Sequence, residues 1–139
     1  MNDMKTTGTV APRPPVVLED DSLAGIPRAR GVARAFIEDL DPAPDPETAE
    51  TLALVVCELA TNALRQGGGY YTLHLSATAH TVDVAVSDLN PAPPRERAPD
   101  LNDGTGGFGW HMVRLLTGHI AITLGPGQQG KTIHARLTR

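Results

Sequence analysis

Residues 45–69 read DPETAETLALVVCELATNALRQGGG and contain the longest helical pattern in the sequence. Asp45 is a residue type that caps helix N-termini, and Pro46 suits the first helical position. Apolar residues then recur at helical spacing, at Leu52, Val55, Val56, Leu59 and Ala63. Because glycine readily ends a helix, residues 67–69 mark its C-terminal end. The stretch therefore predicts a long amphipathic helix with one buried face.

The segments on either side of this helix alternate between helical and strand patterns. Strands are expected at Val16–Leu18, Tyr71–Leu75, Val82–Val86, Ile120–Leu124 and Thr132–Leu137, and further helices at Ile26–Leu40 and Gly109–Thr117. Short turns would join the last four strands into two hairpins. The order predicts an α+β fold, a two-layer sandwich with a mostly antiparallel sheet and helices on one face. Residues 1–15 are expected to be a disordered lead-in to one domain, residues 16–139.

Composition restricts the class of protein. A chain of 139 residues with 40% hydrophobic content suits one globular core. Its formal charge is −4 and it has no basic stripe, which argues against direct nucleic-acid binding. No apolar run reaches the roughly 20 residues that span a bilayer, so no membrane association is expected. The single cysteine, Cys57, excludes an internal disulfide. We expect a cytoplasmic protein.

Glu58 and Asn62 lie four residues apart on the long helix, so their side chains project in the same direction. They fall at the border of its apolar face, where partial desolvation makes a carboxylate a better proton acceptor. The pair could form part of a catalytic site. It could equally consist of a solvated glutamate and an asparagine that caps a neighbouring loop.

Asp88 closes a predicted strand and is followed by Asn90. Such an acid is often a turn former that accepts bonds from nearby amides. Its carboxylate could instead point into a pocket and accept a bond from an exocyclic amino group. Asn90 fits both interpretations, because asparagine tolerates the left-handed conformation of turns.

A glycine-rich segment, residues 104–109, directly precedes a predicted helix. Glycines let the backbone approach a ligand, and the free amides of a helix N-terminus attract phosphate. A flexible turn is the alternative. The spacing also fits a dinucleotide fingerprint, but that motif needs a hydrophobic strand before the glycines, and residues 94–103 form a charged loop instead.

Together these segments resemble the GHKL (histidine-kinase-like) ATPase superfamily, most closely its anti-sigma-factor serine/threonine-protein kinases. The matching segments are Cys57–Ala63 on a helix, Val84–Asp88 on a strand, Thr105–Gly109 before a helix and Gly130–Thr132 opening the last strand. The resemblance covers residues 26–137, and the order of the four segments makes it more specific than any one of them.

The resemblance implies an ATP and Mg²⁺ site of the GHKL (Bergerat) type. Asn62 would bind the magnesium ion, Asp88 would accept the adenine amino group with Thr132 supporting it through water, and Glu58 would be the general base. Asn90 would belong to the same nucleotide site. The lid would hinge on Gly104, Thr105, Gly106, Gly107, Phe108 and Gly109.

The same resemblance implies a kinase that phosphorylates an anti-sigma-factor antagonist and sequesters a sigma factor, with homodimerisation possible. Two departures from the usual pattern leave an alternative open. Gln66 stands where many relatives have histidine, and Phe108 where many have a basic or small residue. The alternative is a non-catalytic, ATP-sensing module that binds protein partners.

Overall fold

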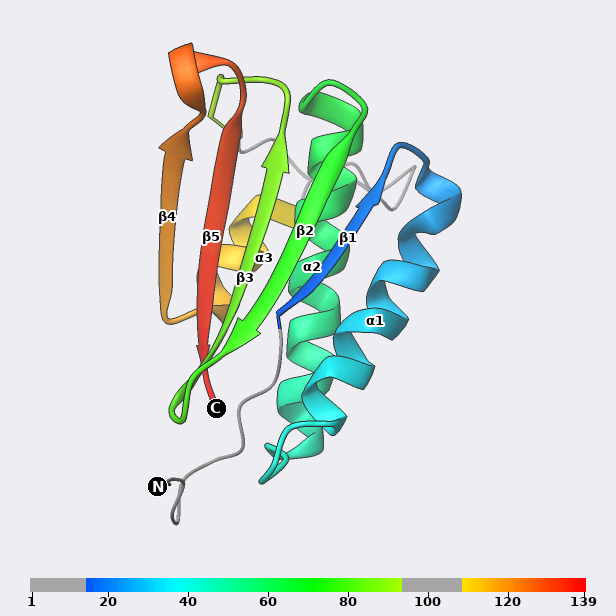
Figure 1. Ribbon diagram of the computed structural model, residues 1–139, viewed down its shortest axis with the longest axis vertical. Helices are drawn as coiled ribbons and strands as arrows, with labels where there is room; N and C mark the ends of the chain where they lie inside the picture. The colour runs from blue at the N-terminus through cyan, green and yellow to red at the C-terminus, as the bar shows by residue number, and fades with distance from the viewer. Residues whose placement is uncertain (1–14, 94–108) are drawn as a thin grey trace, which may run out of the picture.

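The computed structural model describes residues 15–93 and 109–139, which form an antiparallel sheet covered on one face by α-helices (Figure 1). In chain order the elements are β1 Val16–Asp20, α1 Ile26–Glu38, α2 Pro46–Gln66, β2 Tyr71–Ala77, β3 Thr81–Asp88, α3 Gly109–Leu116, β4 His119–Leu124 and β5 Lys131–Thr138. The predicted α+β sandwich is confirmed. Each element lies where the sequence predicted it, and the bounds differ by a few residues at most.

The long helix α2 begins as its sequence predicts. The Asp45 side chain accepts a hydrogen bond from the backbone amide of Glu47, and Pro46 occupies the first turn. The helix ends where the amide of Gly67 donates to the carbonyl of Ala63 at 2.9 Å. Local capping therefore sets both ends of the helix that carries Glu58 and Asn62.

The five strands are ordered β1-β2-β3-β5-β4, and every neighbouring pair is antiparallel. The C-terminal strand β5 is thus inserted between β3 and β4. Its register with β3 places Asp88 directly opposite Lys131 and Ser87 opposite Thr132. Hairpin patterns alone do not specify this β3–β5 pairing, which joins residues more than forty positions apart.

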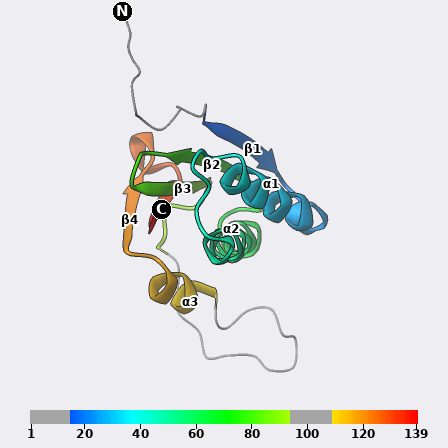
Figure 2. The same cartoon turned by 90° about the horizontal axis from the view of Figure 1, so that it is seen from below.

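All three α-helices lie on the same side of the sheet, with α2 between α1 and α3 (Figure 2). Their apolar faces and the inward side chains of the strands form one core, which includes Phe36, Leu52, Leu59, Leu73 and Ile133. The opposite face of the sheet is not covered by any described element. Within residues 15–93 and 109–139, no helix is long and apolar enough to cross a membrane.

Successive side chains of β3 and β5 point alternately to the helix-covered face and to the uncovered face of the sheet. On β3, Val82, Val84, Val86 and Asp88 are buried toward the helices, whereas the residues between them are half-exposed. On β5, the inward set is Lys131, Ile133, Ala135 and Leu137. These two rows of inward side chains are apolar except at one end. Asp88 and Lys131 occupy those ends, at the same edge of the core.

Candidate functional site

The C-terminal end of α2 is tied to the segment that leaves β3. The amide of Leu89 donates to the carbonyl of Gly67 at 2.9 Å, and Asn90 Nδ2 donates to the carbonyl of Gln66 at 2.8 Å. Gln66 is the last residue of α2 and Gly67 is its C-cap, and carbonyls at the end of a helix have no partner within it. These bonds bring Asp88 and Asn90 against the end of the helix that carries Glu58 and Asn62.

Asp88 and Lys131 form a buried ion pair at this junction. Lys131 Nζ donates to Asp88 Oδ2 at 2.8 Å and to Oδ1 at 3.1 Å. The exposed fractions are 7% for Asp88 and 3% for Lys131. Asp88 Oδ1 also accepts from the amide of Asn90 at 2.9 Å, and Lys131 donates further to the Asn90 carbonyl at 3.0 Å. The carboxylate is therefore held in one orientation from two sides.

Two glycines pack directly against Asp88. A Cβ atom added at Gly67 would lie 2.5 Å from Asp88 Oδ2, and one added at Gly130 would overlap the backbone oxygen of Asp88. Gly130 also has a φ of 94°, a conformation that residues with side chains rarely adopt. The backbone thus approaches Asp88 more closely than any other residue type allows.

Glu58, Asn62 and Gln66 follow one another at intervals of four along α2, so they lie on one side of the helix. Thr51, two turns before Glu58, lines a small cavity of 260 Å³ with Leu116 and Gly118 at the end of α3. This side of α2 therefore faces α3. Glu58, Asn62 and Gln66 thus form a line along the helix surface. It begins at Glu58 and ends about 12 Å farther along the axis at Gln66, whose backbone carbonyl accepts a hydrogen bond from Asn90.

The Glu58 and Asn62 side chains are both half-buried, and neither is hydrogen-bonded to another described residue. Burial raises the pKa of the Glu58 carboxyl above its ordinary value of 4.5. A raised pKa and free lone pairs make Glu58 suited to accept a proton. Asn62 offers a carboxamide oxygen, which is the kind of ligand that Mg²⁺ prefers.

The raised pKa of Glu58 predicts how pH affects stability. The folded protein binds this proton more tightly than the unfolded chain, so its contribution is complete below pH 4.5 and is lost as pH rises through the raised value. Glu58→Gln should therefore raise the free energy of unfolding at pH 7 and leave it nearly unchanged at pH 4. Urea denaturation at the two pH values measures the difference. Glu47→Gln, on the exposed first turn of α2, controls for the lost charge, and equal effects of both variants would contradict the prediction.

Thr132 lies on the outer face of the sheet, away from the helices. Its hydroxyl is 2.7 Å from that of Ser87, its cross-strand partner. The residue of β5 beside Asp88 is instead Lys131. The support of Asp88 by Thr132 through water stays a prediction, and no direct bond joins the two residues. Gly109 begins α3, whereas Gly104, Thr105, Gly106, Gly107 and Phe108 lie outside the described residues.

Sequence reasoning missed Lys131 as a site residue, although its position carried a signal. Lys131 is in phase with Ile133, Ala135 and Leu137, the apolar inward row of its strand. A lysine in such a row must find an acidic partner if it is buried. The partner could not be named without the register of β3 and β5.

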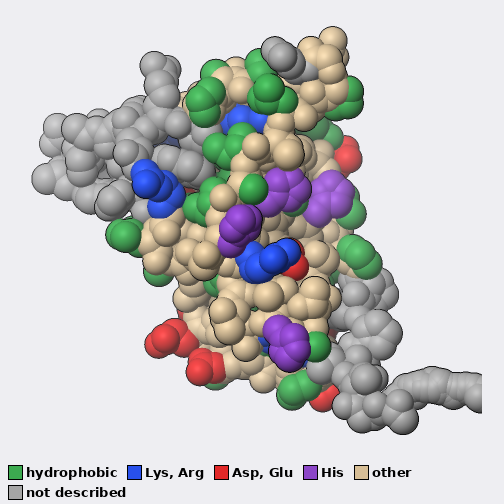
Figure 3. Space-filling model, turned by 90° about the vertical axis from the view of Figure 1, so that its left-hand side faces the viewer, with side chains coloured by type: hydrophobic (Ala, Val, Ile, Leu, Met, Phe, Trp, Pro, Cys, Tyr) green, Lys and Arg blue, Asp and Glu red, His purple; other side chains and the backbone are tan. Residues whose placement is uncertain are grey.

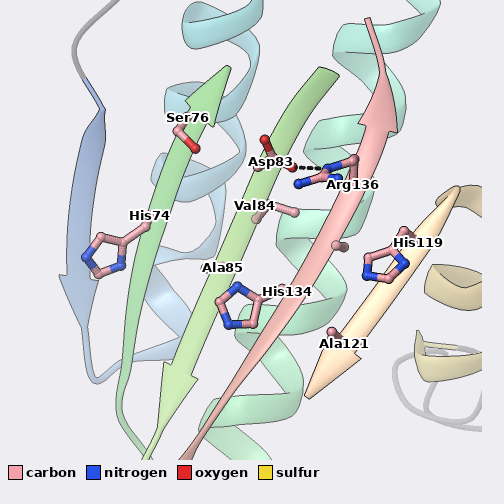
Figure 4. A pocket seen from close by; sticks show the side chains of 10 residues that line it. His74, Ser76, Asp83, Val84, Ala85, His119, Ala121, His134 and Arg136 are labelled. Atoms are coloured by element: carbon pink, nitrogen blue, oxygen red, sulfur yellow. Dashed lines mark hydrogen bonds and ion pairs between the residues drawn. The ribbon is translucent and has the colours of Figure 1, made fainter. Parts of the chain in front are cut away.

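The uncovered face of the sheet has a separate hollow of 390 Å³ (Figures 3 and 4). His74, His119 and His134 line it together with Arg136, which donates to Asp83 at 2.7 Å. The hollow forms because the two cross-strand neighbours of His134, Ala85 and Ala121, have small side chains. Among the residues the structure describes, no three histidine, cysteine or acidic side chains are grouped to hold a metal ion. This hollow lies on the opposite side of the sheet from Asp88.

The structure combines an α+β domain, a long helix whose Glu58 and Asn62 side chains have no partner among the described residues, and a buried strand-end aspartate beside close-packed glycines. Residues 21–137 match the family model described as the histidine kinase-like ATPase domain. The match covers most of the chain, which therefore belongs to the histidine kinase-like ATPase family. A search of curated proteins found no match. The family assignment confirms the GHKL resemblance.

Proposed function

We propose that this protein is an ATP-dependent serine/threonine kinase that phosphorylates an anti-sigma-factor antagonist and sequesters a sigma factor. Membership of a histidine kinase-like ATPase family supports nucleotide binding. The observation that carries the proposal is the line along α2, with the Glu58 carboxylate, unpartnered among the described residues, at one end and Asp88 held at the other. This regulation would take place in the cytoplasm by protein contacts, without binding to DNA, and a homodimer would suit it.

The residues present fit a magnesium-bound nucleotide. Asp88 offers a fixed acceptor for the base, and Gly67 adds no side chain beside its Oδ2 atom, which accepts from Lys131 alone among the described residues. Asn62 would hold the magnesium ion, which neutralises phosphate charge and positions the terminal phosphate. The N-terminal end of α3, which follows the glycine-rich segment in the sequence, would donate its first amides to the phosphates.

In this proposal Glu58 accepts the proton of the substrate serine hydroxyl as that oxygen attacks the terminal phosphate. The reaction depends mainly on positioning and charge neutralisation, so the base must be free and correctly placed. The half-buried Glu58 meets the first condition, since it has no partner among the described residues. Burial raises the pKa of the Glu58 carboxyl, which makes it a stronger proton acceptor.

Glu58→Ala tests the catalytic assignment. We expect MgATP binding to remain nearly intact by calorimetric titration, and phosphoryl transfer to fall by roughly a hundredfold or more because general-base assistance is lost. Transfer is measured with labelled ATP and candidate antagonist proteins. Glu50→Ala is the matched control, because Glu50 is an exposed acid on the same helix. Unchanged transfer in the Glu58 variant would remove this residue from the mechanism.

The second candidate is an ATP-sensing module of the same fold without kinase activity. The Gln66 position favours it, because many members of the family that this chain resembles have histidine there and glutamine lacks the imidazole. In this case ATP would order the site and change the affinity for a protein partner. Labelled ATP separates the two candidates, since only the kinase transfers label to another protein. Absence of MgATP binding by the unaltered protein would reject both.

A further inference from the structure

The Lys131 ammonium group is fully engaged at the junction of α2 and β3. Its three hydrogen bonds go to Asp88 Oδ1, to Asp88 Oδ2 and to the carbonyl of Asn90. An ammonium group has only three N–H donors, so none is left for a phosphate or a substrate. Lys131 therefore acts on Asp88 and not directly on a ligand.

The Asp88 carboxylate, in contrast, is not fully engaged. Oδ1 accepts from Lys131 and from the amide of Asn90, whereas Oδ2 accepts from Lys131 alone among the described residues. A carboxylate oxygen can accept about two hydrogen bonds. One acceptor position consequently remains on Oδ2.

Gly67 lies beside this remaining position. A side chain there would start 2.5 Å from Oδ2 and 2.6 Å from the Asp88 carboxyl carbon, which is closer than real contacts allow. Because Gly67 has no side chain, the end of α2 packs against this flank of Oδ2 without displacing the carboxylate. The two bonds from Lys131 and the bond from the amide of Asn90 prevent the carboxylate from rotating.

We propose that Lys131 is a positioning residue that keeps Asp88 charged and oriented as the acceptor for the amino group of a purine base. It thereby makes the site select adenine over a 6-oxopurine. The inference rests on the proposed function, since it concerns the base of the nucleotide bound at the same site. It assigns a role to Lys131 that the sequence motifs did not give it.

The selection follows from hydrogen-bond chemistry. The 6-amino group of adenine donates a hydrogen bond to the charged Oδ2, and a bond to a charged acceptor is stronger than one between neutral groups. Hypoxanthine has a carbonyl oxygen at that place, which would face a carboxylate oxygen and repel it. Without the ammonium, the buried carboxylate loses its compensating charge and its fixed orientation, so the preference should disappear.

The test compares the dissociation constants of MgATP and magnesium inosine triphosphate for the wild type and Lys131→Met. The wild type should prefer ATP by roughly tenfold or more. In Lys131→Met the affinity for ATP should fall to that for inosine triphosphate, whose own affinity changes little. Equal weakening of both nucleotides would assign Lys131 a merely structural role and overturn the proposal. Tighter ATP binding by the variant would also overturn it, because Lys131 would then compete with the base.

A measurement on the wild type keeps the proposal testable if Lys131→Met does not fold. The sequence has two lysines, Lys5 and Lys131, so ¹⁵N-lysine labelling gives a simple side-chain spectrum, and Lys5→Arg assigns it. ATP should shift the Lys131 ammonium resonance, and inosine triphosphate should shift it much less. Equal shifts, or no shift at saturating ATP, would contradict the proposal. A wild type that binds neither nucleotide would instead reject the proposed function itself.

Discussion

Lys131→Met is expected to lower the free energy of unfolding by about 3–5 kcal/mol, because it leaves the buried Asp88 carboxylate without its counter-charge. The two side chains are each 2% exposed, so solvent compensates only weakly for the lost partner. The double variant Asp88→Asn/Lys131→Met removes both charges together and should be more stable than Lys131→Met alone. Urea denaturation followed by circular dichroism measures all three proteins.

The exposed ion pair between Arg136 and Asp83 provides the matched control. It joins the same two strands, but its side chains are 55% and 27% exposed. Because solvent screens such pairs, Arg136→Met should cost at most about 1 kcal/mol. If Lys131→Met cost no more than Arg136→Met, Asp88 would not depend on Lys131 in the folded protein.

Gly130→Ala is expected to destabilise the protein by roughly 3 kcal/mol or more, because it combines backbone strain with a steric clash. Its φ of 94° is unfavourable for alanine. The added Cβ would also overlap the backbone oxygen of Asp88, and a backbone atom cannot move aside as a flexible side chain can. The resulting shift would displace Asp88, so nucleotide binding should weaken together with stability.

Gly127→Ala separates these two causes. Gly127 belongs to the same turn between β4 and β5 and has a φ of 63°, but nothing lies within 4 Å of its added Cβ. Its replacement should cost only the backbone strain, about 1–2 kcal/mol. Thermal or urea denaturation of the two variants gives the comparison. Equal losses would show that the contact with Asp88 is unimportant.

The candidate site was predictable only where its residues share one element. Glu58 and Asn62 lie on one helix, so their spacing alone placed them on the same side. Asp88 was predicted as an acceptor at a strand end, but its partner was not identified. Lys131 is remote in sequence, and its pairing with Asp88 depends on the register of β3 against β5. Alternation along β5 turns the Thr132 side chain to the outer face, and its support of Asp88 through water stays a prediction.

The helices, the strands, the capped ends of α2 and the α+β class were predictable from local patterns, because capping and periodicity act between residues close in the chain. The sequence also carried the motifs of a histidine kinase-like ATPase. Only the tertiary structure decided that β5 enters the sheet between β3 and β4. That insertion buries Lys131 against Asp88, beside the end of α2. Such pairing depends on packing between distant segments, and local patterns do not specify it.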